Sequence, residues 1–191
     1  MWTEVSVERV PPSRWLNGGG QTRELVAWPI GLPEWTLRVS IADIAQDGPF
    51  SAFHGIRRWF AILEGGGVRL ADSVNLTVGD PLYEFDGALA PACSLLDGQP
   101  VRDFNVMSRE NPEHTVKVID AKSEPAWTAS LKTKWIGLFT VDQGAIVVNS
   151  TGTKELGRMS LIWSDSLEPS TTLTAQFFGS GAAYWIILEA N

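Results

Sequence analysis

Short strand-like runs are the feature that most constrains the fold. Runs rich in β-branched and aromatic residues recur at intervals of about ten residues, separated by Gly, Pro, Asp or Asn. No segment shows a long helical period with caps, although residues 8–16 have room for a short turn. An all-β chain is therefore predicted. The predicted strands span residues 2–7, 22–28, 35–44, 57–63, 67–71, 82–85, 101–107, 114–119, 135–141, 145–148, 159–163, 173–178 and 182–188.

The best candidate boundary between two β units is the segment 109–113. It is charged, lacks apolar residues and contains a proline. We therefore predict an N-terminal barrel over residues 1–110 and a C-terminal barrel over 111–191, with exchange of strands between the halves left open. The segment 121–134 is less regular and suits a loop between the halves.

Charge and targeting signals exclude several classes of partner. Fifteen basic and 22 acidic residues give a net charge of −7, and no basic cluster exceeds two adjacent residues, which argues against nucleic acid. The first residues lack the basic and apolar regions of a secretory signal, and no apolar run approaches the roughly 20 residues of a membrane span. We expect a cytoplasmic protein with no membrane partner.

The cysteine and histidine content argues against a metal site or a thiol nucleophile. Cys93 is the only cysteine, so it forms no internal disulfide, and its favoured role is that of a small buried apolar residue. A catalytic thiol needs a nearby base, for which only His54 and His114 exist. The sequence has no His-x-His pair, so a histidine-rich metal cage is excluded. We predict no cofactor.

Two predicted strands carry one polar and one apolar face. In 35–42, alternation places Trp35, Leu37, Val39 and Ile41 opposite Thr36, Arg38, Ser40 and Ala42. In 101–107, it places Asp103, Asn105 and Met107 opposite Phe104 and Val106. In Arg57-Arg58 the two side chains point to opposite faces, so at most one of them enters a pocket.

Several blocks in the first 110 residues, taken in order, resemble the HutD/Ves family. They are WLNGGGQTRE at 15–24, WP at 28–29, the strand 35–42, GPFSAF at 48–53, Gly55, Arg58, LEGGG at 63–67, DG at 97–98 and DFNVM at 103–107. The resemblance implies a bicupin, with two RmlC-like jelly-roll β-sandwich barrels in one chain. It also implies a link to histidine utilisation, while Ves-type members are linked to cold-responsive expression. It favours Arg58 over Arg57 as the residue in the pocket.

Arg38 is the first candidate for a ligand contact. A guanidinium inside a barrel is costly unless it meets a carboxylate. That carboxylate is either a structural partner, Asp103 or Glu24, or the carboxylate of a ligand gripped in bidentate fashion. Both interpretations stay open from the sequence alone.

The remaining pocket candidates are small polar groups and apolar walls. The expected walls are Phe50, Phe53, Trp28, Trp59 and Met107. The run Asn17-Gly18-Gly19-Gly20 is interpreted as a tight turn rather than a phosphate cradle, with Asn17 or Thr22 at the rim. The predicted ligand-binding residues are Asn17, Thr22, Glu24, Arg38, Ser40, Ser51, Phe53, Arg58, Asp103, Asn105 and Met107.

Three functional hypotheses follow. The leading one is a metal-independent protein that binds a small carboxylate and regulates histidine breakdown, with urocanate or formylglutamate as candidate ligands. The alternative is a metal-independent cupin enzyme, an isomerase or hydrolase of a small acid, with Glu24 or Asp103 as base, although an arginine partner is expected to keep both ionised. The third is a scaffold that forms a homodimer through Trp127, Trp135 or Trp163.

Overall fold

The computed structural model describes residues 1–149, 152–165 and 173–191, and the secondary structure in them is β-strand with two short 3-10 turns. Every predicted strand is present, so the all-β prediction is confirmed. None of the described helical segments is long and apolar enough to cross a membrane. The chain divides into two compact units, which are an N-terminal unit, Val10–Glu110, and a C-terminal unit made of Met1–Arg9 and Asn111–Asn191.

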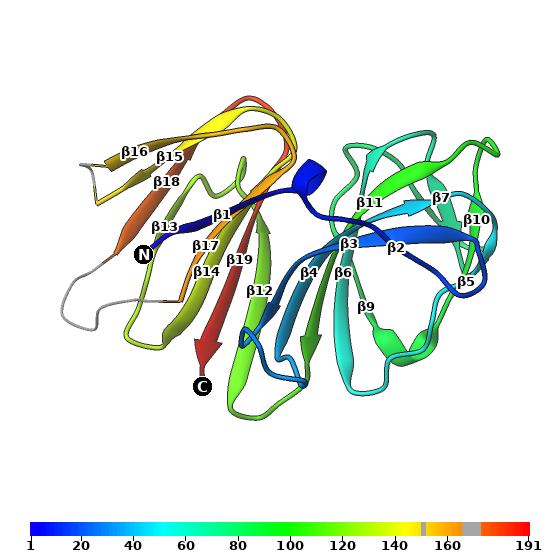
Figure 1. Cartoon of the computed structure of the whole chain (residues 1–191), viewed down its shortest axis with the longest axis horizontal. Coiled ribbons are helices and arrows are strands. Elements are labelled where there is room, and N and C mark those ends of the chain that lie inside the picture. The colour runs from blue at the N-terminus through cyan, green and yellow to red at the C-terminus, as the bar shows by residue number, and fades with distance from the viewer. Residues whose placement is uncertain (150–151, 166–172) are drawn as a thin grey trace. The chain divides into compact units, whose positions relative to one another are not determined.

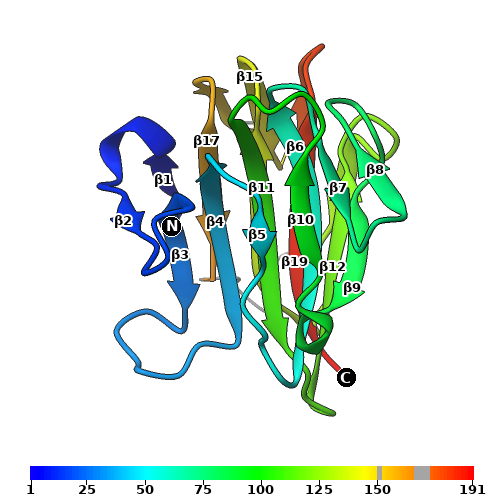
Figure 2. The same cartoon turned by 90° about the vertical axis from the view of Figure 1, so that its right-hand side faces the viewer.

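The N-terminal unit contains two sheets, seen in Figure 2 with the four-stranded sheet in front of β4, β11 and β6. The six-stranded sheet has the order β2 (Ser13–Arg14), β3 (Gly20–Trp28), β4 (Leu37–Ile44), β11 (Val101–Arg109), β6 (Ile56–Glu64) and β9 (Tyr83–Asp86). The four-stranded sheet has the order β5 (Gly48–Pro49), β10 (Ala92–Leu95), β7 (Val68–Leu70) and β8 (Val74–Leu76). A 3-10 turn, η2 (Gly87–Leu89), follows β9.

The apolar core of this unit lies between its two sheets. Phe60, Ile62 and Val101 from the six-stranded sheet form one cluster with Leu70 and Cys93 from the four-stranded sheet. Removal of such side chains from water is the main driving force for sandwich packing. The buried position of Cys93 confirms the prediction that it acts as a small apolar residue, and burial, followed by the charges of Asp103 and Asp47, raises the pKa of its thiol to about 12.

The C-terminal unit is also a pair of sheets around its own core. One sheet has the order β1 (Thr3–Ser6), β17 (Ser160–Ser164), β14 (Thr133–Thr140), β19 (Ala183–Ala190) and β12 (His114–Asp120). The other has the order β13 (Ala126–Thr128), β18 (Thr174–Phe178), β15 (Gly144–Val148) and β16 (Gly152–Leu156). Ile136, Leu138 and Trp185 from the first sheet pack with Ile146 and Phe177 from the second.

The first nine residues belong to the C-terminal unit, whereas the sequence placed them in the N-terminal barrel and left exchange of strands between the halves open. Strand β1 pairs antiparallel with β17, Val5 opposite Leu161, and the turn η1 (Val7–Arg9) follows it. In Figure 1 the blue β1 runs beside the orange β17. The main-chain N–H of Val7 donates to the carbonyl of Met159 at 2.9 Å. More than 150 residues separate β1 from β17 in the sequence. Alternation within β1 predicts a strand but does not indicate which strand it pairs with.

The tryptophans suggested for a dimer interface pack largely against other residues of the same chain. Trp135 is fully buried, Trp163 is buried, and their rings stack with centroids 5.8 Å apart. Trp127 is partly buried against the C-terminal core. Intramolecular packing uses the apolar surface of Trp135 and Trp163, and a homodimer through Trp127, Trp135 or Trp163 stays a prediction.

Deletion of residues 1–9 is expected to destabilise the C-terminal unit. The deletion uncovers the edge of β17 and removes Val7, which is buried, and Trp2, which packs on the core. We expect the melting temperature to fall by at least about 4 °C in thermal unfolding followed by circular dichroism. Glu8→Ala, an exposed change in the same segment, is the control. An equal melting temperature for the deletion and the control would contradict this role of β1.

Candidate functional site

A cavity of about 440 Å³ lies in the N-terminal unit, next to the apolar core on the inner face of the six-stranded sheet. This volume suits a small metabolite. Strands β4, β6 and β11 form its floor, and the β2–β3 hairpin and the segment 49–53 complete its wall. The lining residues are Ser13, Arg14, Trp15, Leu16, Asn17, Thr22, Arg38, Ser40, Ala42, Pro49, Phe50, Ser51, Phe53, Arg58, Asp103, Asn105 and Met107.

The strand register arranges the polar side chains of the floor in rows. Met107 of β11 lies between Arg38 of β4 and Arg58 of β6. Two residues along β11, Asn105 pairs with Ser40, and two residues further Asp103 pairs with Ala42. Because side chains alternate along a strand, all of these groups point to one face of the sheet. The alternation predicted from the sequence thus brings together the polar groups of two strands that are distant in the chain.

The mouth of the cavity is shaped by the hairpin between β2 and β3. Gly18 has a φ of 72° in this turn, and the Asn17 side chain accepts a hydrogen bond from the N–H of Gly19 at 3.0 Å. The Trp15 indole donates to the Thr22 hydroxyl at 2.8 Å, which fixes the ring over the start of β3. The prediction that the glycine run forms a tight turn is confirmed. Leu16 is fully exposed at this rim.

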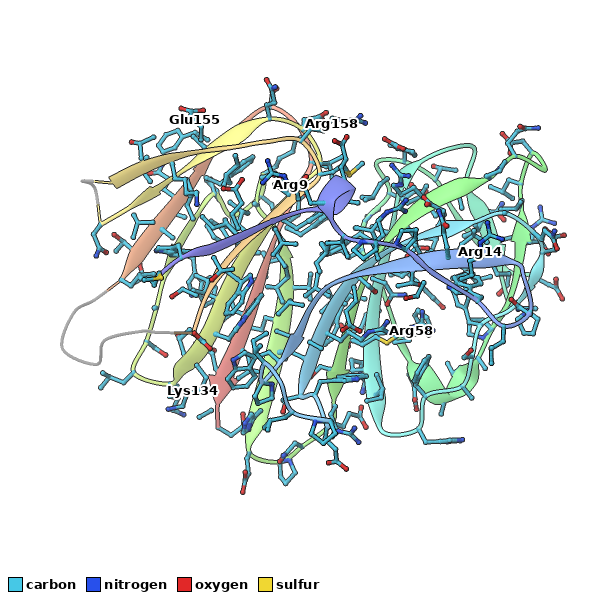
Figure 3. All side chains as sticks on the ribbon, in the orientation of Figure 1. Arg9, Arg14, Arg58, Lys134, Glu155 and Arg158 are labelled. Atoms are coloured by element: carbon cyan, nitrogen blue, oxygen red, sulfur yellow. The ribbon has the colours of Figure 1, made fainter. Side chains whose placement is uncertain are left out.

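Arg58 is the most unusual residue of the site. Its side chain is only 4% exposed, and its Nε has no hydrogen-bond partner among the described residues. The guanidinium lies over the rings of Phe50 at 4.9 Å, Phe85 at 5.0 Å and Phe53 at 5.9 Å, which provide cation–π attraction. Figure 3 shows Arg58 within the N-terminal unit. Burial, partly offset by the charge of Asp103, lowers the pKa of Arg58 to about 10, so the side chain stays cationic at neutral pH.

Asp103 is the second buried ionisable group. Its side chain is 1% exposed and its Oδ1 has no hydrogen-bond partner among the described residues. Burial raises the pKa of Asp103 to about 8, although the charge of Arg58 acts in the opposite direction. An arginine was expected to keep Asp103 ionised, but the loss of solvation outweighs the attraction of the guanidinium and shifts the pKa in the opposite direction. Burial thus favours the neutral carboxyl of Asp103 well above the pH at which an ordinary aspartate ionises.

Arg38 differs from Arg58 because it has a carboxylate partner. Its Nε donates to Glu24 at 2.7 Å, and Nη1 lies 3.9 Å from the Met107 sulfur. Glu24 is about half exposed, so water weakens this pair. Arg38 thus lines the cavity and also forms the salt bridge with Glu24 considered from the sequence. Glu24 itself does not line the cavity, so its predicted place among the pocket residues is wrong.

The other predicted pocket residues share this one cavity. It brings together Asn17, Thr22, Arg38, Ser40, Ser51, Phe53, Arg58, Asp103, Asn105 and Met107. Among the expected walls, Phe50 lines it, whereas Trp28 and Trp59 do not. Trp59 points to the opposite face from Arg58, where its indole donates to Glu84 at 3.1 Å. Arg57 also points away and pairs with Glu110 at 2.8 Å, as alternation predicts.

Six lining residues were not predicted from the sequence. They are Ser13, Arg14, Trp15 and Leu16 in the β2–β3 hairpin, together with Ala42 and Pro49. Alternation from Arg38 and Ser40 already points to Ala42 on the same face. The hairpin carries a weaker signal, since β2 is only two residues long. Its position depends on pairing with β3, where Ser13 lies opposite Thr22.

The described residues contain no cluster of three or more His, Cys, Asp or Glu side chains arranged to hold a metal ion. His54 lies exposed in the turn after Phe53, and His114 begins β12 in the C-terminal unit. The polar groups that do converge on the cavity are guanidinium, carboxyl, amide and hydroxyl, which suit hydrogen bonding to an organic ligand.

The family model for HutD matches residues 7–184. The chain belongs to the HutD family. It is also 36% identical over 108 residues to Protein Ves of Escherichia fergusonii, an alignment that covers 55% of this chain and 56% of that protein. The chain therefore spans about half the length of the curated relatives it matches. The resemblance proposed from the sequence blocks is confirmed.

Solved structures support the same fold. HutD from Pseudomonas fluorescens matches over 100% of both chains with a TM-score of 0.77 and 21% identity. A conserved protein of unknown function from Pseudomonas aeruginosa covers 100% of this chain and 98% of its own, with a TM-score of 0.79 and 24% identity. More distant cupin-like structures match as well. At these identities the likeness shows the fold alone.

Asp103→Asn is expected to stabilise the ligand-free protein in a pH-dependent way. The folded state holds a proton on Asp103 up to about pH 8, whereas the unfolded state loses it near the ordinary value of 3.8. The stability contributed by the neutral carboxyl is fully present below the unfolded pKa and is lost as pH rises through the folded pKa.

We therefore expect the advantage of Asp103→Asn over wild type to grow between pH 4 and pH 8, by at most about 1.4 kcal/mol per pH unit, and to level off above pH 8. Denaturant unfolding across this range measures it. The exposed Asp72→Asn is the matched control. A difference that does not vary with pH would show that Asp103 is ionised in the native state.

Proposed function

We propose that this protein is a cytoplasmic, metal-independent binding protein for a small carboxylate, acting in the regulation of histidine utilisation. Urocanate and N-formylglutamate are the candidate ligands, because both are small acids of that pathway. The pathway link comes from the HutD family, and the choice of ligand class comes from the chemistry of the cavity.

The observation that carries this proposal is the unsatisfied charge of Arg58. None of the ion pairs found among the described residues includes Arg58. Asp103 is the carboxyl whose charge acts on Arg58, and burial raises the pKa of Asp103 to about 8. A buried cation without an ionised partner is costly, and an anion bound in the cavity would offset that cost. A ligand carboxylate fits because the planar guanidinium presents several N–H donors.

The rest of the cavity supports a small ligand with an apolar part. Phe50, Phe53 and Met107 offer apolar surface, and Ser40 and Asn105 offer hydrogen bonds. The Oδ1 of Asn105 has no partner among the described residues, so it is available to accept from a ligand N–H. Both candidate ligands carry such a donor in addition to a carboxylate. Few polar groups in an apolar wall are typical of specific metabolite sites.

The test is isothermal calorimetry with urocanate and with N-formylglutamate at pH 7. We expect one of them to bind to wild type and Arg58→Met to weaken its affinity at least tenfold, because hydrogen bonds to a charged group contribute about 1.5–3 kcal/mol. Methionine replaces the buried cation with an apolar side chain of similar length, so the variant should fold at least as stably. Melting curves check this.

Arg57→Gln is the matched control, since Arg57 is the neighbouring residue on the opposite face. It should bind like wild type. Equal affinity in Arg58→Met and wild type would show that the ligand does not meet Arg58. No heat and no thermal stabilisation with either compound would remove both from the list of ligands.

A metal-independent enzyme is the second candidate, and the protonation of Asp103 favours it. A carboxyl that is neutral at pH 7 serves as a general acid, in contrast to the base suggested from the sequence. Incubation of the chelator-treated protein with each candidate acid, followed by mass spectrometry, tests for turnover. Product that forms in wild type and not in Asp103→Asn would support this function, and unchanged acid in both samples would contradict it.

A further inference from the structure

We propose that Asp103 takes part in the anion site as a neutral carboxylic acid that donates its O–H to the ligand, so that anion binding requires a proton on Asp103. This inference rests on the proposed function, because it assigns the role of one residue in the same cavity. It makes the affinity for the ligand a function of pH in the physiological range.

The geometry supports the neutral form. The carboxyl is 1% exposed and its Oδ1 has no hydrogen-bond donor among the described residues. An ionised carboxylate in such a place would lose its hydration without gaining N–H or O–H donors in return, which strongly favours the protonated state. The Nε of Arg58 is also without a partner, so the guanidinium does not use that atom to bond Asp103.

An anion in the cavity adds to this preference. A ligand carboxylate near Arg58 would share the low-dielectric cavity with Asp103, and two negative charges repel each other strongly there. A protonated Asp103 removes this repulsion and supplies a donor. Binding of the anion therefore strengthens the binding of the proton to Asp103, just as protonation of Asp103 permits the anion to bind.

The charged and titratable groups that line the cavity, pair with a lining residue or act on Asp103 by their charge come from five strands. They are Arg58 on β6, Arg38 and Asp43 on β4, Glu24 on β3, Cys93 on β10 and Arg14 on β2. Burial raises the pKa of Asp43, but hydrogen bonds from Arg102, Gln21 and Arg23 outweigh burial and lower this pKa to about 2. The pKa of Cys93 is raised to about 12, and Arg58 stays cationic because its pKa is about 10. These three groups keep their charge state between pH 7 and pH 9.

The experiment measures the dissociation constant of N-formylglutamate, whose carboxylates stay ionised, at pH 7, 8 and 9. With a pKa of about 8 for Asp103, we expect wild type to bind about tenfold more weakly at pH 9 than at pH 7. In Asp103→Asn the side chain is uncharged at every pH. Whatever its affinity at pH 7, we expect that affinity to change less than twofold across the range.

Two further variants identify the titrating group. Glu24→Gln removes the carboxylate that pairs with the lining residue Arg38, and Asp72→Asn removes an exposed carboxylate elsewhere in the same unit. Both should keep the tenfold dependence. Calorimetry of wild type in buffers of different ionisation enthalpy gives a readout that needs no variant, with uptake of about half a proton per ligand expected at pH 8 and nearly one at pH 9.

The outcomes separate this inference from the function on which it rests. A wild-type affinity that does not change with pH, or an equal change in Asp103→Asn, would overturn the role of Asp103 and leave the anion site in place. No proton uptake at pH 8 and 9 would do the same. Absence of binding at all three pH values, with urocanate as well, would overturn the proposed function and this inference together.

Discussion

The structure of the site depends on two buried ionisable groups, Arg58 and Asp103, that share one cavity without forming an ion pair. Arg58 remains cationic because its pKa stays near 10 despite burial, and aromatic rings lie next to the guanidinium. Burial favours the neutral form of Asp103. An ionised Asp103 paired with Arg58 would neutralise the guanidinium, and the pair would no longer attract an anion. A neutral Asp103 leaves one net positive charge inside the sheet sandwich. The affinity of the cavity for anions follows from that imbalance.

The fold holds these groups in place because the central strands are buried on both faces. Leu37, Val39 and Ile41 of β4 are fully buried opposite Arg38 and Ser40, and Phe104 and Val106 of β11 are fully buried opposite Asp103 and Asn105. A shift of the register by one residue would exchange each polar row for an apolar one. The polar rows are thus fixed by the packing of the face that they do not occupy, which gives a small-ligand site a rigid floor.

Alternation explains why so much of this site was predictable from the sequence. A period of two in 35–42 and 101–107 was enough to assign the faces of Arg38, Ser40, Asp103 and Asn105, and the same rule separates Arg58 from Arg57. Three features were not predictable in this way. The partner of β1, the position of the β2 hairpin and the charge of Asp103 depend on which distant segments surround a residue, and spacing along the chain does not contain that information.

Asp103 shows where the charge state of an aspartate can no longer be predicted from the sequence. An aspartate near an arginine is ionised when water reaches the pair, as for Asp43, a partly exposed residue near the end of β4 that accepts hydrogen bonds from Arg23 and Arg102. Asp43 and Asp103 lie on adjacent strands of one sheet, and each has an arginine nearby, yet their pKa values shift in opposite directions. The difference arises from the number of hydrogen bonds to the carboxylate and from access to solvent. The inner face of the sheet therefore changes the chemistry of a residue type that forms an ordinary salt bridge where water reaches it.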